Sequence, residues 1–209
     1  MDAILLNHIY KSHPLLNDIS ITVKYGEIYG IVGKQSTSLL KIILGQSYYN
    51  QGQVRILESN QNKSLSRNRK RIGYAINTHF FKSLNASKNL YYYCLIKGIY
   101  DKKEVEHVLQ LVGLQDNHLL YRDFSHDMKN RLAIAKALLG HPAILLLDEP
   151  MKDLNDKEIS SMRQLLFTLN KQGVTILLSS HCINHLNGLV THLCIIEYGC
   201  IKEIKEGNL

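Results

Sequence analysis

The amino-acid sequence predicts an α/β domain built around a mainly parallel β-sheet. Three apolar runs of strand length, at residues 27–33, 143–147 and 174–178, alternate with amphipathic stretches of helical periodicity. This alternation is typical of parallel sheets, whose ligands bind outside the carboxyl ends of the strands. The polar or glycine positions at the ends of these runs are therefore candidate site residues, namely Gly33, Asp148 and His181.

The remaining elements are predicted from periodicity in the same way. Ala3–Tyr10 and Ile19–Val23 are typical of β-strands, and residues 192–204 predict one or two edge strands around a turn at 198–199. Small hydroxyl residues at the start of the first helix indicate an N-cap there. Helices are expected over Ser36–Leu44, Asn85–Ile99, Lys102–Val112, Met128–Leu139 and Asp156–Gln172.

Length and composition fit one globular domain. The chain has 209 residues, of which 45% are hydrophobic and 21% charged, so it can bury a substantial core. No segment has the run of about 18 apolar residues that a membrane-spanning helix needs. The N-terminal sequence MDAILLNHIY also has no basic region typical of a signal peptide. We therefore expect a cytoplasmic protein that reaches a membrane only through a partner.

The net charge of +7 is compatible with phosphate, anionic lipid or nucleic acid ligands, or simply with a solvated basic surface. Basic residues cluster only in Lys63–Arg71, whose role the sequence leaves open. Because no aromatic residues are interleaved with this run, we do not expect nucleic acid as a partner. The four cysteines fit no zinc-binding spacing, so we interpret them as core or surface thiols: Cys94, Cys182, Cys194 and Cys200.

The segment Leu145–Pro150, LLLDEP, carries the clearest chemistry. An apolar strand places two adjacent carboxylates at the edge of the sheet. Asp148 is suited to hold Mg²⁺ through water, and Glu149 to orient or deprotonate an attacking water. The simpler alternative is that both are ordinary acidic residues of a turn after a buried strand.

This segment resembles the Walker B motif of ABC ATPases, and the resemblance extends along essentially the whole chain. Within the family, the sequence around Ile72 and Met128 is most similar to ATPase subunits of bacterial peptide-antibiotic exporters and immunity transporters. In the family's order, Tyr10 resembles the aromatic residue that stacks on adenine, and Tyr25–Gly33 resembles the strand entering the phosphate loop. Ile72–Asn77 resembles the segment ending in the Q-loop, and Leu84–Leu90 resembles the entry of the helical subdomain. Phe124–Leu132 resembles the signature motif, and Ser179–His181 resembles the segment with the switch histidine.

The resemblance implies a P-loop NTPase-like ABC cassette over residues 1–209. This cassette would have helices flanking the sheet, an antiparallel N-terminal β part and a helical subdomain near residues 80–139. ATP and Mg²⁺ are the implied ligands. The implied partners are a multi-span permease, which would hold the chain at the inner face of the cell membrane, and a second ABC subunit, in a homodimer or a heterodimer. Cargo, permease and direction of transport are left open.

The resemblance also assigns roles to individual residues. Glu149 and His181 would be catalytic, and Mg²⁺ would be held by Thr37, Asn77 and Asp148. The nucleotide would be bound by Tyr10, Gly33, Lys34, Ser36, Thr37, Ser38 and, across a dimer, Ser125.

The phosphate loop departs from the family pattern. In G-x-x-x-x-G-K-[ST] the lysine stands six positions after the first glycine, whereas the aligned Ser36 stands three positions after Gly33. The loop is therefore three residues short, lacks its inner glycines and has no lysine at the usual position. Thr37 takes the Mg²⁺ hydroxyl position, and Lys34 could supply a cation only from a different side. Losing one charge-assisted contact costs about 1.5–3 kcal/mol, so we expect weak ATP binding.

The signature motif departs as well. Ser125 is retained, but the two glycine positions hold His126 and Asp127. A carboxylate about 4 Å from a partner's phosphate would repel it by roughly 4 kcal/mol at an effective dielectric constant of 20. The Q-loop position holds Asn77 in place of glutamine, and the D-loop position reads DLND at residues 153–156.

Three functions are compatible with this pattern. The first is a transporter subunit that exports, or gives immunity to, a peptide antibiotic with weak or absent ATP hydrolysis. The second is a non-hydrolysing regulatory or structural partner of a permease. The third is an active ATPase in which Lys34 compensates for the altered loop.

Overall fold

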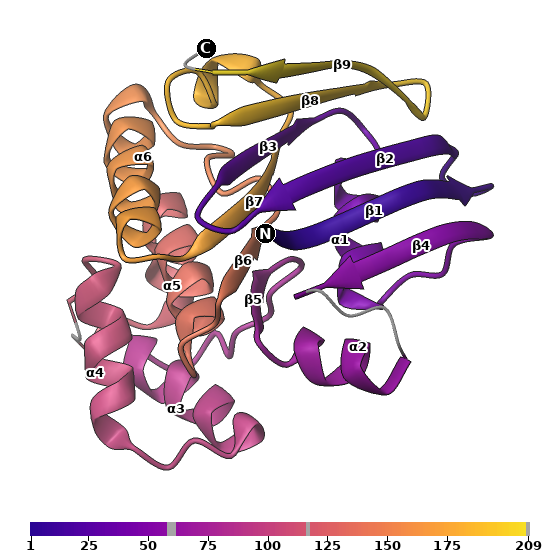
Figure 1. Ribbon diagram of the computed structural model, residues 1–209. Coiled ribbons are helices and arrows are strands. Elements are labelled where there is room, and N and C mark those ends of the chain that lie inside the picture. The colour runs from indigo at the N-terminus through magenta and orange to yellow at the C-terminus, as the bar shows by residue number, and fades with distance from the viewer. Residues whose placement is uncertain (58–61, 116–117, 208–209) are drawn as a thin grey trace.

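The computed structural model describes residues 1–57, 62–115 and 118–207, with the side chains of 62–64 and 102 excluded. The basic run at 63–71 is therefore described in full only from residue 65. The chain forms two sheets, which enclose one helix, and a group of helices on the outer face of the larger sheet (Figure 1).

The larger sheet has six strands in the order β5-β6-β7-β3-β8-β9. All neighbouring pairs are parallel except β8 and β9, which form an antiparallel hairpin. Non-consecutive neighbours are typical of a sheet with crossover helices. The bounds are β3 Ile28–Val32, β5 Ile72–Ala75, β6 Ile144–Leu147, β7 Thr175–Ser180, β8 His192–Glu197 and β9 Cys200–Glu206.

The residues of the central strands alternate between two hydrophobic cores, one on each face of the larger sheet. Ile144 and Leu146 of β6 face the core that contains the smaller sheet. Leu145 and Leu147 face the core that contains the outer helices. Because side chains of a strand alternate in direction, a strand buried on both faces is continuously apolar. This explains why β3 and β6 are buried at every position.

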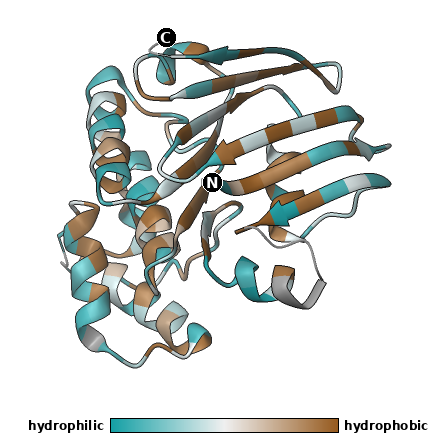
Figure 2. Cartoon of the chain, in the orientation of Figure 1, coloured by the Kyte–Doolittle hydropathy of each residue, from teal (hydrophilic) through white to brown (hydrophobic). Residues whose placement is uncertain are grey.

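The smaller sheet is antiparallel, with the order β2-β1-β4 and bounds β1 Asp2–Lys11, β2 Leu16–Lys24 and β4 Gln51–Ile56. One of its faces is buried, so hydrophobic and hydrophilic residues alternate along β2 (Figure 2). Helix α1, Ser36–Leu44, lies between the two sheets and contributes Leu39, Leu40, Ile42 and Ile43 to their shared core.

The helical subdomain consists of α3 Ala86–Lys97, α4 Lys102–Leu111 and α5 His126–Leu138, which lie on the left of Figure 1, with α3 and α4 below α5. Helix α6, Asp156–Lys171, covers the same face of the larger sheet, and its Leu166 and Leu169 enter the outer core. The short helix α2, Asn62–Arg69, precedes β5. Within the described part of the chain, no helix is long and apolar enough to cross a membrane.

The predicted fold class is confirmed, and one local expectation is wrong. The N-cap of α1 is Gln35, which makes no side-chain capping hydrogen bond, and Ser36 is already helical. The hydroxyl groups expected to cap this helix are placed elsewhere, since Thr37 contacts Asp148 and Ser38 is buried. All four cysteines are free thiols, as predicted.

Candidate functional site

The carboxyl ends of four parallel strands meet at one edge of the larger sheet. Val32 of β3 pairs with Ser180 of β7, and Leu147 of β6 pairs with both Ala75 of β5 and Leu178 of β7. The residues that follow these strand ends therefore share that edge. They are Gly33, Asn77, Asp148 and His181.

Asp148 is the centre of a group of oxygen atoms at this edge. Its Oδ1 atom accepts hydrogen bonds from Thr37 Oγ1, at 2.8 Å, and from Ser179 Oγ, at 2.7 Å. Ser179 Oγ in turn accepts a hydrogen bond from the backbone amide of Glu149 at 2.9 Å. The structure thus brings Thr37 and Asp148, two of the residues predicted to hold Mg²⁺, within hydrogen-bond distance of each other. Ser179 was not predicted as a site residue, although it lies directly after an apolar run.

Glu149 and His181 form a second contact at the same edge. Glu149 Oε2 lies 2.7 Å from His181 Nδ1, within hydrogen-bond distance. The side chain of Glu149 is 25% exposed and that of His181 is 61% exposed, so both can reach solvent or a ligand. A carboxylate that holds an imidazole in this way fixes the orientation of the ring. The pair is therefore suited to orient a water molecule and to move its proton.

The phosphate loop consists of only Lys34 and Gln35 between Gly33 and the start of α1. Gly33 has a φ of +143°, and a Cβ atom at this position would lie 2.3 Å from the carbonyl oxygen of Ile196. Only glycine fits such a turn. Ser36, at the usual lysine position, is 3% exposed, and Lys34 is exposed to solvent.

The residues at this edge fit Mg²⁺ better than they fit a phosphate group. Hydroxyl and carboxylate oxygens of Thr37 and Asp148 are ligands that Mg²⁺ prefers, and Mg²⁺ commonly binds through one carboxylate together with water and phosphate. The described residues contain no cluster of three or more His, Cys, Asp or Glu side chains that could hold a metal. Bound Mg²⁺ would supply positive charge opposite a phosphate.

For a phosphate, the start of α1 offers only part of the usual cradle. The first-turn amides of a helix have no partner within the helix and favour an anion. The first turn of α1 contains no acidic residue, so no side chain of its own competes for them. However, a loop of two residues cannot wrap its amides around a phosphate chain as a longer glycine-rich loop does. The site therefore fits an anion without enclosing it.

Tyr10 lies away from these residues in sequence, near the end of β1, and is half-buried. Its carbonyl oxygen accepts a hydrogen bond from the amide of Asn50 at 2.7 Å. The adjacent Lys11 is buried, and its Nζ donates to Ser47 Oγ at 3.0 Å and to the carbonyl of Tyr48 at 2.9 Å. These bonds fix the strand end that carries Tyr10. Its role towards adenine stays a prediction.

The start of α5 differs from the expectation for Asp127. Ser125 is the N-cap, and its Oγ accepts a hydrogen bond from the amide of Met128 at 3.2 Å. The Asp127 carboxylate, however, turns to Arg131, whose Nε lies 2.7 Å from Asp127 Oδ2. The Asp127 side chain is 19% exposed. The charge expected to repel a partner's phosphate is thus neutralised within the same helix.

Arg131 links three helices around this carboxylate. Its Nη1 donates to the carbonyl of Val112 at 2.7 Å, just after α4, and its Nη2 donates to Ser161 Oγ of α6 at 2.9 Å. Asp127 Oδ1 is buried and has no hydrogen-bond partner among the described residues. Arg131 was missed in the sequence, although a carboxylate four residues before an arginine is a recognisable helical ion pair.

The two remaining altered motifs also have defined local structures. Asn77 lies in the loop after β5 with a φ of +46°, a left-handed conformation that asparagine tolerates better than most residues. In the D-loop segment, Asn155 is the N-cap of α6 and forms a capping box with Glu158. Asn155 therefore has a structural role in starting α6.

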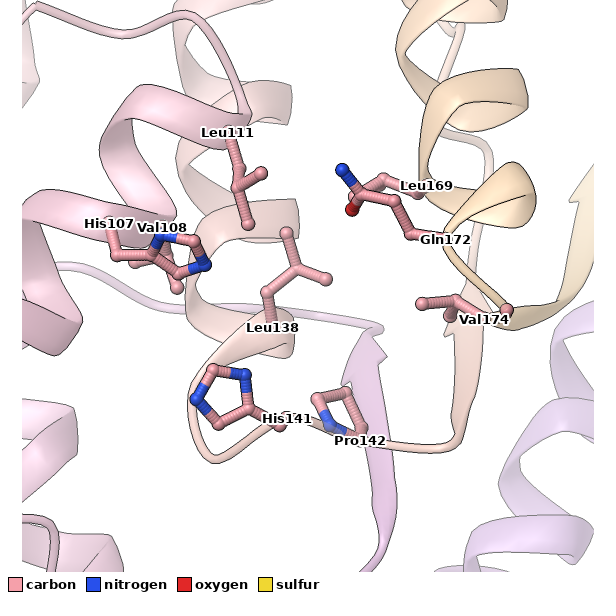
Figure 3. Close-up of a pocket in the computed structure, with 10 residues that line it drawn as sticks. His107, Val108, Leu111, Leu138, His141, Pro142, Leu169, Gln172 and Val174 are labelled. Carbon is pink, nitrogen blue, oxygen red and sulfur yellow. The ribbon is translucent and has the colours of Figure 1, made fainter.

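A separate cleft of about 280 Å³ lies at the opposite edge of the sheet, between α4, the end of α5 and the end of α6 (Figure 3). Its floor is apolar, with Val108, Leu138 and Leu169 buried. His107 and His141 lie on one side and Gln172 on the other (Figure 3). None of the predicted site residues lines this cleft.

The fold and the carboxyl-edge residues together define a nucleotide-binding α/β cassette. The ABC transporter family model matches residues 16–152, and the chain belongs to this family.

Relatives of known name support the assignment. The chain is 36% identical over 204 residues to the bacitracin transport ATP-binding protein BcrA of Bacillus licheniformis, covering 95% of this chain and 67% of that protein. It is 30% identical over 200 residues to BcrA of Enterococcus faecalis, covering 93% and 65%. The chain thus spans about two thirds of the length of these relatives.

Solved structures show the same fold. A dimeric structure of the ATP-binding cassette MJ0796, in a post-hydrolysis state bound to ADP and Pi, aligns with a TM-score of 0.82 at 22% identity. The alignment covers 97% of this chain and 98% of that one. CbiO1 from Clostridium perfringens, part of the ABC transporter complex CbiONQ, aligns with a TM-score of 0.84 at 21% identity, covering 99% and 88%.

Proposed function

We propose that this chain is the nucleotide-binding subunit of an ABC transporter that exports, or gives immunity to, a bacitracin-like peptide antibiotic, with weak or absent ATP hydrolysis. The observation that carries the proposal on hydrolysis is the two-residue loop between Gly33 and α1. The cargo class is supported by the identity of 36% to a bacitracin transport protein.

The site retains one half of the machinery for phosphoryl transfer. Thr37 and Asp148 are 2.8 Å apart and supply oxygens for Mg²⁺, while Glu149 and His181 are positioned to orient water. The other half, a loop that encloses the phosphates and carries a lysine, is reduced. Since phosphoryl transfer depends mainly on positioning and charge stabilisation, this loss lowers turnover.

The proposed permease surface lies on α3 and the loop after Asn77. Five large hydrophobic residues of this region are exposed, and Phe81 packs edge-on against Tyr92. Exposed hydrophobic clusters commonly mark interaction surfaces. The exposed residues are Phe81, Tyr91, Tyr92, Leu95 and Ile96. Docking there would hold the chain at the inner face of the membrane, where it would dimerise with a second ABC subunit.

Calorimetric titration with MgATP, combined with phosphate release by the purified chain with and without its permease, tests this proposal. We expect weak nucleotide binding and little turnover. Robust hydrolysis that Glu149→Gln abolishes would contradict the reduced-turnover proposal and support an active ATPase. Permease binding without any nucleotide binding would instead support a structural or regulatory partner.

A further inference from the structure

Lys136 of α5 is a buried cation at the contact between α5 and β5. Its side chain is 6% exposed, and its Nζ donates to the carbonyl oxygen of Tyr74 at 3.0 Å. The same Nζ lies 3.9 Å from the ring centroid of Tyr74 and 5.5 Å from that of Tyr93. No ion pair found among the described residues includes Lys136. One carbonyl and two aromatic faces therefore hold this ammonium group.

The backbones of α5 and β5 touch directly beside Lys136. A Cβ atom added to Gly73 would lie 2.0 Å from the carbonyl oxygen of Ala137. A side chain at residue 73 would collide with this carbonyl oxygen. β5 can therefore pack this closely against α5 only because residue 73 is glycine. Lys136 and Ala137 of the helix are thus fixed to Gly73 and Tyr74 of the strand at adjacent positions.

Both elements lead to residues of the proposed function. Helix α5 begins after its N-cap Ser125, the residue predicted to contact the partner's nucleotide. Strand β5 ends at Ala75, two residues before Asn77 and close in sequence to the proposed permease surface. We propose that Lys136 is a positioning residue that makes α5 and β5 move as one unit, so that displacement of the Asn77 loop is transmitted to Ser125. This inference rests on the proposed function.

The charge of Lys136 makes this contact sensitive to pH. Burial, and secondarily the nearby Lys97, lower the pKa of Lys136 to about 8. The groups that face it are Tyr74 of β5 and Tyr93 and Lys97 of α3. If α5 and β5 separate, Lys136 regains water and its ordinary pKa near 10.4. Raising the pH from 8 towards 10 therefore favours the packed arrangement, and below pH 8 the dependence ends.

NMR of the intact chain tests the coupling without nucleotide or permease. Asn77→Asp supplies a small perturbation at the loop, and the amide of Met128, bonded to Ser125 Oγ, reports at the other end. We expect the Met128 shift caused by Asn77→Asp to fall at least threefold when Lys136→Met is added. Lys136→Arg should restore it, and Lys103→Met, at an exposed position of α4, should leave it unchanged.

The pH series separates positioning from simple structural support. In the otherwise unmodified Lys136 background, the transmitted shift should rise between about pH 8 and pH 10, and in Lys136→Arg this rise should be absent. The proposal would be overturned by equal transmission in Lys136→Met, by failure of Lys136→Arg to restore transmission, or by no rise between about pH 8 and pH 10. Should Lys136→Met not fold, the arginine variant and the pH series still decide. Failure of the proposed function would instead show as absent nucleotide and permease binding with transmission intact.

Discussion

Replacing Arg131 with methionine should strongly destabilise the protein, because Arg131 is the partner of a mostly buried carboxylate. The Asp127 and Arg131 side chains are 19% and 12% exposed, and their contact is 2.7 Å. Removing one member of a buried pair costs about 3–5 kcal/mol, reduced here to roughly 2–4 kcal/mol by partial exposure. The lost bonds to Val112 and Ser161 add about 1 kcal/mol.

A double-mutant cycle isolates the pair itself. Asp127→Ala should cost less than Arg131→Met, since Asp127 Oδ1 already lacks a partner among the described residues. With both changes combined, we expect a coupling energy of about 1.5–3 kcal/mol, as for a hydrogen bond between charged groups. Urea unfolding followed by circular dichroism measures each free energy of unfolding.

The neighbouring pair Arg122 and Asp123 is a matched control. Their atoms are 3.5 Å apart and their side chains are 63% and 51% exposed, so their coupling should be below about 1 kcal/mol. A coupling energy within about 0.5 kcal/mol of zero for Asp127 and Arg131 would refute this reasoning. It would mean that the Asp127 charge points to solvent and remains free to repel a partner's phosphate.

Three further changes test other parts of the structure. Thr37→Val removes the 2.8 Å hydrogen bond to Asp148 and should lower the free energy of unfolding by about 1–2 kcal/mol; an unchanged denaturation midpoint would argue against that contact. Gly33→Ala should cost about 2–4 kcal/mol, because its φ is +143° and a Cβ would lie 2.3 Å from the Ile196 carbonyl; an unaffected melting temperature would exclude this turn. Between pH 8 and pH 9 the unmodified protein should gain about 1 kcal/mol of stability relative to Lys136→Met, since a lowered lysine pKa makes folding more favourable as pH rises; parallel stability curves would contradict the burial of a charged Lys136.

The elements with strong periodicity could be predicted from the sequence. The bounds of α1 agree with the structure, and the three apolar runs became β3, β6 and β7. The site edge followed from the same runs, because parallel strands share a carboxyl edge. By contrast, β4, α2 and the short β5 were not predicted as elements. α2 is strongly polar, and β5 has four residues with a glycine that gives no strand signal.

The orientation of side chains was harder to predict than their position. A glycine-to-aspartate change in a signature motif predicts repulsion only if the carboxylate faces outward. Here the Asp127 carboxylate pairs with Arg131, one helical turn later. The position of Arg131 in turn depends on its hydrogen bonds to Val112, just after α4, and to Ser161 of α6. The caps of α1 were mispredicted for a similar reason, because Thr37 bonds to Asp148, 111 residues away, and not to its own helix.

The shortened phosphate loop is the central feature of this account, and nucleotide affinity tests it most directly. Calorimetry should compare MgATP binding by the unmodified chain with that of a variant carrying a three-residue, glycine-containing insertion after Gly33 together with Ser36→Lys. The same insertion with Ser36 retained separates loop length from charge. We predict weak binding by the unmodified chain and at least tenfold tighter binding by the full restoration, equivalent to about 1.4 kcal/mol. Tight binding by the unmodified chain, or no gain on restoration, would contradict the account.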